Sequence, residues 1–254
     1  MPTTYILIGG GCFGSHHLRQ LEKGRAKGRI GPDDRIVVVD RNPACRVIRE
    51  LAEAPNPHVR VLRSDWLTYY CAAIDGLPAE DEIVPAPFAP HLAAEWLLWS
   101  LQQHLGPAAV ARVPFADAFG GLPYEALGPS GDRFISAAGW VCPPNCRAPR
   151  KCPAILAPRT WDLNDTIRAF AAAHADRYLP PVIFNTLYRT TGIETILADT
   201  FRRLRDDVLA LAQQGEIAGK QLIIATASPC HGATTLVEFA PVAAAVASAP
   251  ESAA

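Results

Sequence analysis

The chain has 254 residues, of which 49% are hydrophobic and 19% are charged, and its formal net charge is -1. This composition excludes an intrinsically disordered chain, which would have too little apolar surface to form a core. It also lacks the excess of basic charge that nucleic-acid binders carry. We therefore expect a globular protein that acts on a small-molecule substrate or a redox partner and not on nucleic acid. Homo-oligomerisation is left open.

Residues 1–10 contain a short apolar run without a preceding basic segment or a following cleavage-site pattern, so no secretory signal is expected. No stretch approaches the roughly 18 uninterrupted apolar residues of a membrane span. We expect a cytoplasmic protein without membrane insertion. The odd number of cysteines, 7, argues against a disulfide scaffold and favours reduced thiols, some of which can hold metal.

The first third of the chain alternates short β-branched runs with amphipathic stretches, the pattern of a parallel sheet with crossover helices. The strands that we predict there cover residues 5–8, 35–39, 59–62 and 82–84. The helices cover residues 12 to about 23, a stretch opening at Asn42-Pro43, and 91–104. Residues 114–160 are dense in Pro and Gly and are predicted to be a loop or linker. Beyond them the prediction gives a helix near 163–174, a strand at 182–187, a helix at 193–214 and a strand at 221–227.

These elements predict an α/β fold: a Rossmann-like, mostly parallel, doubly wound sheet with a Cys/Pro-rich insertion and a C-terminal αβ extension. Residues 1–110 are predicted to form a dinucleotide-binding Rossmann unit. Residues 111–254 are predicted to form the Cys-rich loop and a C-terminal αβ segment, packed on the same or an adjoining sheet.

A glycine-rich turn, Gly9-Gly10-Gly11-Cys12-Phe13-Gly14, follows the first predicted strand and opens the first predicted helix. It satisfies G-x-G-x-x-G through its first, third and last glycines. In such a motif the first glycine permits a tight turn, the second lets the backbone approach a pyrophosphate, and the third lets the helix pack close to the strand. We interpret the whole turn, including Cys12 and Phe13, as a dinucleotide site. A glycine-rich turn that binds nothing is the alternative.

Three further residues are candidate contacts of the same ligand. The second predicted strand ends at Asp40, where an acid would hold a ribose hydroxyl pair. The spacing from Gly14 is longer than the usual ~20 residues, and the basic loop 23–34 accounts for the difference. Arg41 leaves room for NADP beside NAD. Asp65 either faces the adenine edge or caps a helix.

The GGGxFG turn together with Asp40 resembles the NAD(P)-binding Rossmann-fold superfamily, including the TrkA-N type nucleotide-binding domains of potassium transport regulators. The resemblance covers residues 1 to about 110 only. It implies that Gly9, Gly11, Gly14 and Asp40 contact the cofactor. Enzymes that use S-adenosylmethionine also combine a glycine turn with an acid after the second strand, so that ligand remains an alternative.

Three cysteines, Cys142, Cys146 and Cys152, lie in the segment WVCPPNCRAPRKCP. Thiolates on a stiff, proline-rich loop are pre-organised as soft-metal ligands, and a proline directly after a cysteine is typical of ferredoxin cluster motifs. The predicted fourth ligand is Cys230, because it follows the strand predicted at 221–227. The paired CxxC knuckles of zinc sites are absent, so an iron–sulfur cluster is favoured over structural zinc. Unligated thiols are the alternative.

Three residues are candidates for proton transfer. His91 and Glu95 are four apart at the start of the helix predicted at 91–104, so they share a face directed toward the expected cofactor crevice. A general acid and its orienting carboxylate can be arranged in this way, although such a pair can also simply occupy a helix's first turn. His231 follows Cys230 and is interpreted as a substitute ligand or a proton donor.

From these motifs we expect an NAD(P)-dependent redox protein with a cysteine-ligated centre, iron–sulfur or Zn, across the crevice from the nicotinamide cofactor. Whether it is an enzyme, an NAD(P)-dependent oxidoreductase, is left open. Two other classes stay open. One is a nucleotide-sensing regulatory module of the TrkA-N type with structural zinc. The other is a transferase that uses S-adenosylmethionine.

Overall fold

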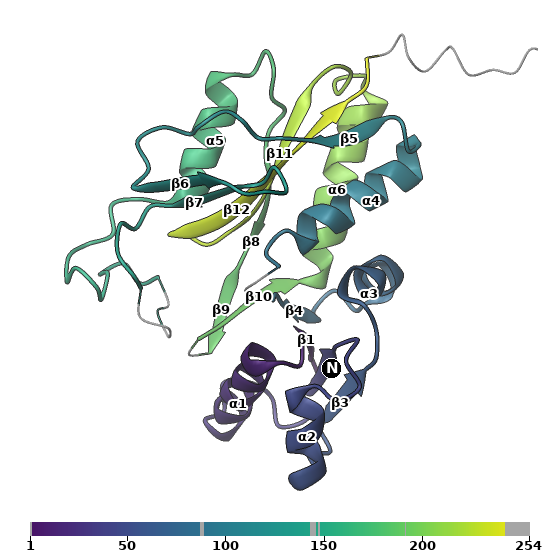
Figure 1. The fold of residues 1–254 in the computed structure, drawn as a ribbon, viewed down its shortest axis with the longest axis vertical. Helices are drawn as coiled ribbons and strands as arrows, with labels where there is room; N and C mark the ends of the chain where they lie inside the picture. Colours follow the sequence, from purple (N-terminus) through teal and green to yellow (C-terminus); the bar gives the residue numbers. More distant parts are fainter. Residues whose placement is uncertain (1, 87–88, 143–145, 147, 191, 242–254) are drawn as a thin grey trace, which may run out of the picture.

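A computed structural model describes residues 2–86, 89–142, 146, 148–190 and 192–241, and it folds into two β-sheets with helices between and around them (Figure 1). The strands are β1 (Thr4–Ile8), β2 (Arg35–Val39), β3 (Val59–Leu62), β4 (Glu82–Val84), β5 (Val110–Val113), β6 (Tyr124–Leu127), β7 (Arg133–Ser136), β8 (Val182–Asn185), β9 (Leu187–Thr190), β10 (Ile193–Leu197), β11 (Gln221–Ala227) and β12 (His231–Phe239). The helices are α1 (Cys12–Ala26), α2 (Arg46–Glu53), α3 (Trp66–Ala73), α4 (Leu92–Leu105), α5 (Leu163–Ala173) and α6 (Ala198–Gln213), with a 3-10 turn, η1, at Ile74–Gly76. The predicted α/β class is confirmed.

The first sheet has the strand order β3-β2-β1-β4-β10-β9. Its first four strands are parallel, which confirms the Rossmann-like arrangement predicted for the start of the chain. Strands β10 and β9 extend it as an antiparallel hairpin that pairs with β4 through β10. The hairpin comes from the C-terminal half of the chain, so residues far apart in the sequence complete one sheet (Figure 1).

The hairpin corrects one predicted element. The sequence predicts a single helix over 193–214, but residues 193–197 form β10 and the helix begins only at Ala198. The β-branched side chains of Ile193, Thr195 and Ile196 are all buried in the sheet, and such side chains suit a pleated surface better than a helix.

The second sheet is mostly antiparallel, with the order β6-β7-β12-β11-β8 and β5 also paired with β12. Among the described strands of this sheet, β8 and β11 are the parallel pair. The β6–β7 hairpin lies inside residues 114–160, which the sequence predicts to be a loop. The turn between its strands is closed by the Gly128 amide, which donates to the Asp132 carbonyl at 2.7 Å.

Helices α3, α4 and α6 pack between the two sheets, and their apolar faces form the largest core with strands of both. Trp96 of α4 and Phe201 of α6 are fully buried there, with ring centroids 5.3 Å apart. Burial of each such side chain contributes about 1.5–3 kcal/mol. On the other face of the first sheet a second core holds residues of α1 and α2, so this sheet is covered on both faces. A third core lies under α5.

Within the described ranges, no helix has the length and apolarity needed to cross a membrane. The Ala-, Ser- and Pro-rich residues 242–254 lie outside the described part of the chain.

Candidate functional site

The turn between β1 and α1 holds its three motif glycines in three different environments. Gly9 has a φ of +93°, which side chains rarely adopt. A Cβ on Gly14 would lie 1.8 Å from the carbonyl oxygen of Gly9, so α1 packs against the end of β1 only because that side chain is missing. A Cβ on Gly11 would meet nothing within 4 Å. The backbone at Gly11 is therefore open to a ligand, while the other two glycines shape the turn.

Asp40, directly after β2, ties this turn to the next strand. Its carboxylate accepts hydrogen bonds from the backbone N–H groups of Gly10 at 2.7 Å and Asn42 at 2.8 Å. A cavity of about 540 Å³ opens beside it, and its lining includes Gly11 and Cys12 at the start of α1. The predicted ribose acid and the open glycine thus border one cavity.

The other predicted cofactor contacts lie around the same turn. Cys12 and Phe13 are exposed on the first turn of α1, and Arg41 is exposed beside Asp40. Asp65 is the N-cap of α3, where its Oδ1 atom accepts from the amides of residues 67 and 68. Of the two interpretations of Asp65, the helix cap is therefore the one realised by its hydrogen bonds.

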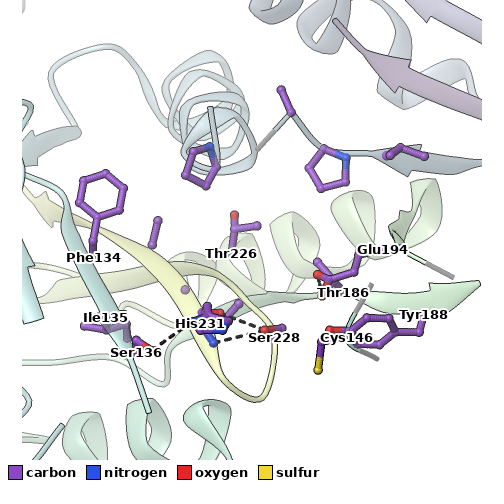
Figure 2. Close-up of a pocket in the computed structure, with 18 of the residues that line it drawn as sticks. Phe134, Ile135, Ser136, Cys146, Thr186, Tyr188, Glu194, Thr226, Ser228 and His231 are labelled. Carbon is purple, nitrogen blue, oxygen red and sulfur yellow. Dashed lines mark hydrogen bonds between the residues drawn. The ribbon is translucent and has the colours of Figure 1, made fainter. Parts of the chain in front are cut away.

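A second cavity, of about 520 Å³, lies where the carboxyl end of β4 meets the second sheet (Figure 2). The first sheet contributes the residues at and after the end of β4, and α1 contributes His17. The second sheet, the loops that follow its strands and the β9–β10 hairpin contribute further polar residues of the lining, which are Tyr124, Ser136, Cys146, Thr186, Tyr188, Glu194, Thr226, Ser228 and His231. Strand β1 lies between β2 and β4, so the chain reverses its winding direction there, and open α/β sheets bind ligands at such a switch point.

Burial shifts the pKa values of His17 and Tyr188, two residues of this cavity, toward the neutral forms of their side chains. Burial, with a smaller contribution from His16, lowers the pKa of His17 to about 4. Burial and the neighbouring Glu194 raise the pKa of Tyr188 well above its usual range. Glu194 also accepts a hydrogen bond from Thr186 Oγ1 at 2.7 Å. At neutral pH the cavity therefore contains a neutral imidazole and a neutral phenol.

His231 is oriented by Ser136, its register partner across β12 and β7 (Figure 2). The Ser136 hydroxyl donates to the carbonyl of Ala138, so the His231 Nδ1–H, 3.0 Å away, is the donor to Ser136 Oγ. This assignment leaves Nε2 as an acceptor facing Cys142 Sγ at 3.3 Å. Burial lowers the pKa of His231, which also favours the neutral ring.

The four cysteines predicted as metal ligands are brought to one region. Cys230 lies in the turn between β11 and β12, and Cys142 follows β7, the strand paired with β12. Cys146 lines the 520 Å³ cavity together with His231. Burial raises the pKa of Cys142, and the three other thiols of the set raise it further, which reflects their proximity.

The loop after Cys146 folds back toward Cys230. An antiparallel bridge joins Lys151 to Pro158, directly beside Cys152. The loop then leads to Trp161, whose indole N–H donates to Cys230 Sγ at 3.4 Å. Among the described residues, no three His, Cys, Asp or Glu side chains are arranged to hold a single metal ion.

The predicted pairing of His91 with Glu95 is not formed. Glu95 instead makes an ion pair with Arg112 of β5, and Arg112 makes a second ion pair with the buried Asp132. His91 is half-buried at the N-cap of α4. Helical spacing predicts that two residues share one face of a helix. It does not predict that an arginine from a strand of the other sheet forms an ion pair with one of them.

Sequence reasoning did not find Ser136, Tyr188 or Glu194. Tyr188 and Glu194 are register partners across the β9–β10 hairpin, and both line the cavity. The signal that predicts such a hairpin is the Thr-Gly pair at 191–192, which separates the run LYRT at 187–190 from the β-branched run IETI at 193–196.

Comparison with known families gives one match. The AF_1314_C family model, described as "Uncharacterized protein, C-terminal domain", matches residues 93–240. This range runs from α4 to the end of β12, and it includes His231 and the four cysteines near it. No curated protein and no solved structure matches the chain.

Proposed function

This chain belongs to the AF_1314_C family, and because that family's description carries no activity, we propose a function from the site itself: the protein is an NAD(P)-linked redox protein. In this proposal the dinucleotide binds at the turn from Gly9 to Gly14. Its nicotinamide end enters the 520 Å³ cavity, where the reacting partner also binds.

The observation that carries the proposal is that the three motif glycines have three different structural roles. One has a positive φ, one is packed against a carbonyl oxygen, and one has open space around it. These are the three requirements for the approach of a pyrophosphate to a strand–turn–helix unit. The N-cap of α1 is Gly11, which has no side chain to cap the helix, so the positive end of the helix dipole favours an anion there.

The positions of the two cavities, on opposite sides of β1, support one orientation of the bound dinucleotide. Asp40 borders the cavity on the β2 side of β1, which suits a ribose. The larger cavity lies on the β4 side, and His17 of α1 is part of its wall. A dinucleotide laid across Gly11 would therefore have its adenosine end beside Asp40 and its nicotinamide end in the larger cavity.

When bound, the nicotinamide supplies hydride chemistry. The chain's own residues supply proton transfer. His231 is held by Ser136, and its Nε2, which faces Cys142 Sγ, can accept a proton. Tyr188 keeps its proton at neutral pH and can donate it. Apolar residues make up much of the remaining wall, which limits the access of water to the reacting groups.

Calorimetry with NADH tests the nucleotide site. We expect Gly11→Asp to weaken NADH binding at least about tenfold, or about 1.4 kcal/mol, because the new carboxylate meets the pyrophosphate. The matched control is Gly76→Asp on the exposed turn η1, where a Cβ likewise meets nothing within 4 Å. The control should bind NADH as the wild type does.

Three outcomes would overturn the proposal. Equal affinities of the wild type and Gly11→Asp would remove the nucleotide site. Binding of S-adenosylmethionine without binding of NADH would favour the transferase. NADH binding with stoichiometric zinc, and no change in the redox state of NADH with any acceptor tried, would favour the regulatory module.

A further inference from the structure

We propose that Cys142, Cys146, Cys152 and Cys230 bind an iron–sulfur cluster at the edge of the 520 Å³ cavity. The site rests on the thiols and on the donors around them, so it stands whether or not NAD(P) binds. Only its relation to the redox reaction rests on the proposed function.

The first argument is the convergence of separate chain segments. The β7–β12 pairing brings Cys142 near the β11–β12 turn that carries Cys230. Cys146 lies in the wall of the cavity that His231 also lines. Cys152 is buried beside the Lys151–Pro158 bridge of the returning loop. Four thiols from two distant parts of the sequence are therefore gathered near the β11–β12 turn, at the edge of the cavity.

The second argument is the set of N–H donors aimed at the sulfur atoms. The Trp161 indole donates to Cys230 Sγ, and the backbone amide of Ala148 donates to Cys146 Sγ, both at 3.4 Å. Hydrogen bonds to cysteine sulfur stabilise the thiolate form and are among the means by which proteins tune iron–sulfur clusters. Two unligated neutral thiols would gain little from them.

The third argument is a pair of buried N–H groups beside the thiols. Burial raises the pKa of Cys142, and a side-chain hydrogen bond from Trp140 partly offsets that rise, so the indole lies beside this sulfur. Burial also raises the pKa of Cys230, and the nearby Arg159 guanidinium partly offsets it. Arg159 Nε is buried without a hydrogen bond to any described residue, and an anionic cluster beside it would supply an acceptor.

The sequence spacing of the cysteines, Cx3Cx5C without a paired CxxC knuckle, favours a cluster over zinc. With zinc–sulfur bonds of about 2.3 Å in a tetrahedron, neighbouring sulfur atoms stand about 3.8 Å apart. No three potential ligands among the described residues are arranged around a single ion. In a four-iron cluster each cysteine binds a different iron, so its sulfur atoms stand further apart.

The test uses the full-length protein, purified without oxygen and then reconstituted with ferrous iron and sulfide. We expect a brown protein with about four irons and four sulfides per chain, whose visible absorbance bleaches on reduction. Cys146→Ser and Cys230→Ser should each lose that absorbance. Cys71→Ser is the matched control, because Cys71 is a half-buried cysteine of α3 outside the set.

Circular dichroism separates loss of the cluster from loss of the fold. Cys146 lies in a loop, so its serine variant should keep the wild-type spectrum. A colourless protein after reconstitution would overturn the proposal, as would a wild type holding one zinc and no iron. Equal iron content in Cys146→Ser, Cys230→Ser and Cys71→Ser would also overturn it. Calorimetric NADH binding is measured on the same samples, so failure of the cluster and failure of the nucleotide site are distinguishable.

Discussion

Glu82 on β4 and Arg189 on β9 form a two-pronged ion pair across the strand that lies between them, β10. The Arg189 guanidinium contacts both carboxylate oxygens, at 2.6 and 2.7 Å, and Thr195 of β10 donates to the same carboxylate at 2.5 Å. The Glu82 side chain is 2% exposed, whereas that of Arg189 is 41% exposed. The pair thus holds the hairpin onto the parallel strands with one buried and one partly solvated charge.

This difference in burial predicts unequal costs for removing the two partners. Arg189→Leu leaves a buried carboxylate without its cation, and we expect a loss of about 3–5 kcal/mol in the free energy of unfolding. Glu82→Gln leaves an arginine that water can still reach, so we expect only about 1–2 kcal/mol. Urea denaturation of both variants measures this, and a larger loss in Glu82→Gln would contradict it.

Gly14→Ala should destabilise the fold much more than Gly11→Ala. The new methyl group at position 14 would collide with the Gly9 carbonyl, which requires a backbone shift costing about 1–3 kcal/mol or more. At position 11 the methyl group enters open space at the N-cap of α1, and the change in stability should stay within about 1 kcal/mol. Thermal denaturation checks the order of the two variants, and equal losses would show that α1 does not pack as described.

His17 should make the protein less stable as the pH falls from about 6.5 to about 4. Its pKa is about 4 in the folded chain and near the ordinary 6.5 in the unfolded chain. The unfolded chain therefore takes up a proton in this window while the folded chain does not, so stability declines on acidification. After allowance for the partial exposure of the ring, the contribution is about 2 kcal/mol.

His17→Gln should remove that decline, as measured by urea denaturation between pH 7 and pH 4. His16→Gln is the matched variant. It removes a neighbouring positive charge that lowers the pKa of His17, so it should make the decline shallower without abolishing it. The same pH dependence in His17→Gln and the wild type would show that this ring takes up its proton normally when folded.

Asp40 should set the preference between the two nicotinamide cofactors. Its carboxylate would repel the 2′-phosphate of NADPH, so we expect the wild type to bind NADH at least about tenfold more tightly. Asp40→Asn should narrow that ratio, and Arg41 beside it would then favour the phosphate. Calorimetry with both cofactors measures the ratio.

Asp65→Asn is the control for this experiment. Asparagine is also a good helix N-cap, so α3 should be retained and the cofactor preference should not move. A change in affinity with Asp65→Asn would show that this carboxylate faces the ligand as well as capping the helix.

The parallel strands could be predicted from the sequence because each is a short apolar run between turn signals. The predicted ranges 35–39, 59–62 and 82–84 coincide with β2, β3 and β4. The start of α6 could not be predicted, because no Pro or Gly separates the end of β10 from the helix. Pairing with β4, more than a hundred residues earlier in the chain, decides that residues 193–197 are a strand.

The same distinction holds for the site. The roles of Gly9 and Gly14 are set within a few residues of the turn, and the turn has the geometry that the motif predicts. The partner of Glu95 is set by the packing of β5 against α4, which helical spacing does not encode. Tyr188 and Glu194 reach the cavity only because the hairpin joins the first sheet.

The β9–β10 hairpin also determines whether the N-terminal part of the protein can be produced as a separate fragment. A fragment ending near residue 110 would lack the strand that covers the outer edge of β4. It would present unpaired backbone groups, and the carboxylate of Glu82 would lose its counter-ion. Such an uncovered edge pairs with strands from other molecules. The N-terminal part should therefore aggregate when it is expressed alone, and it should not fold when it is transferred to another protein without the hairpin.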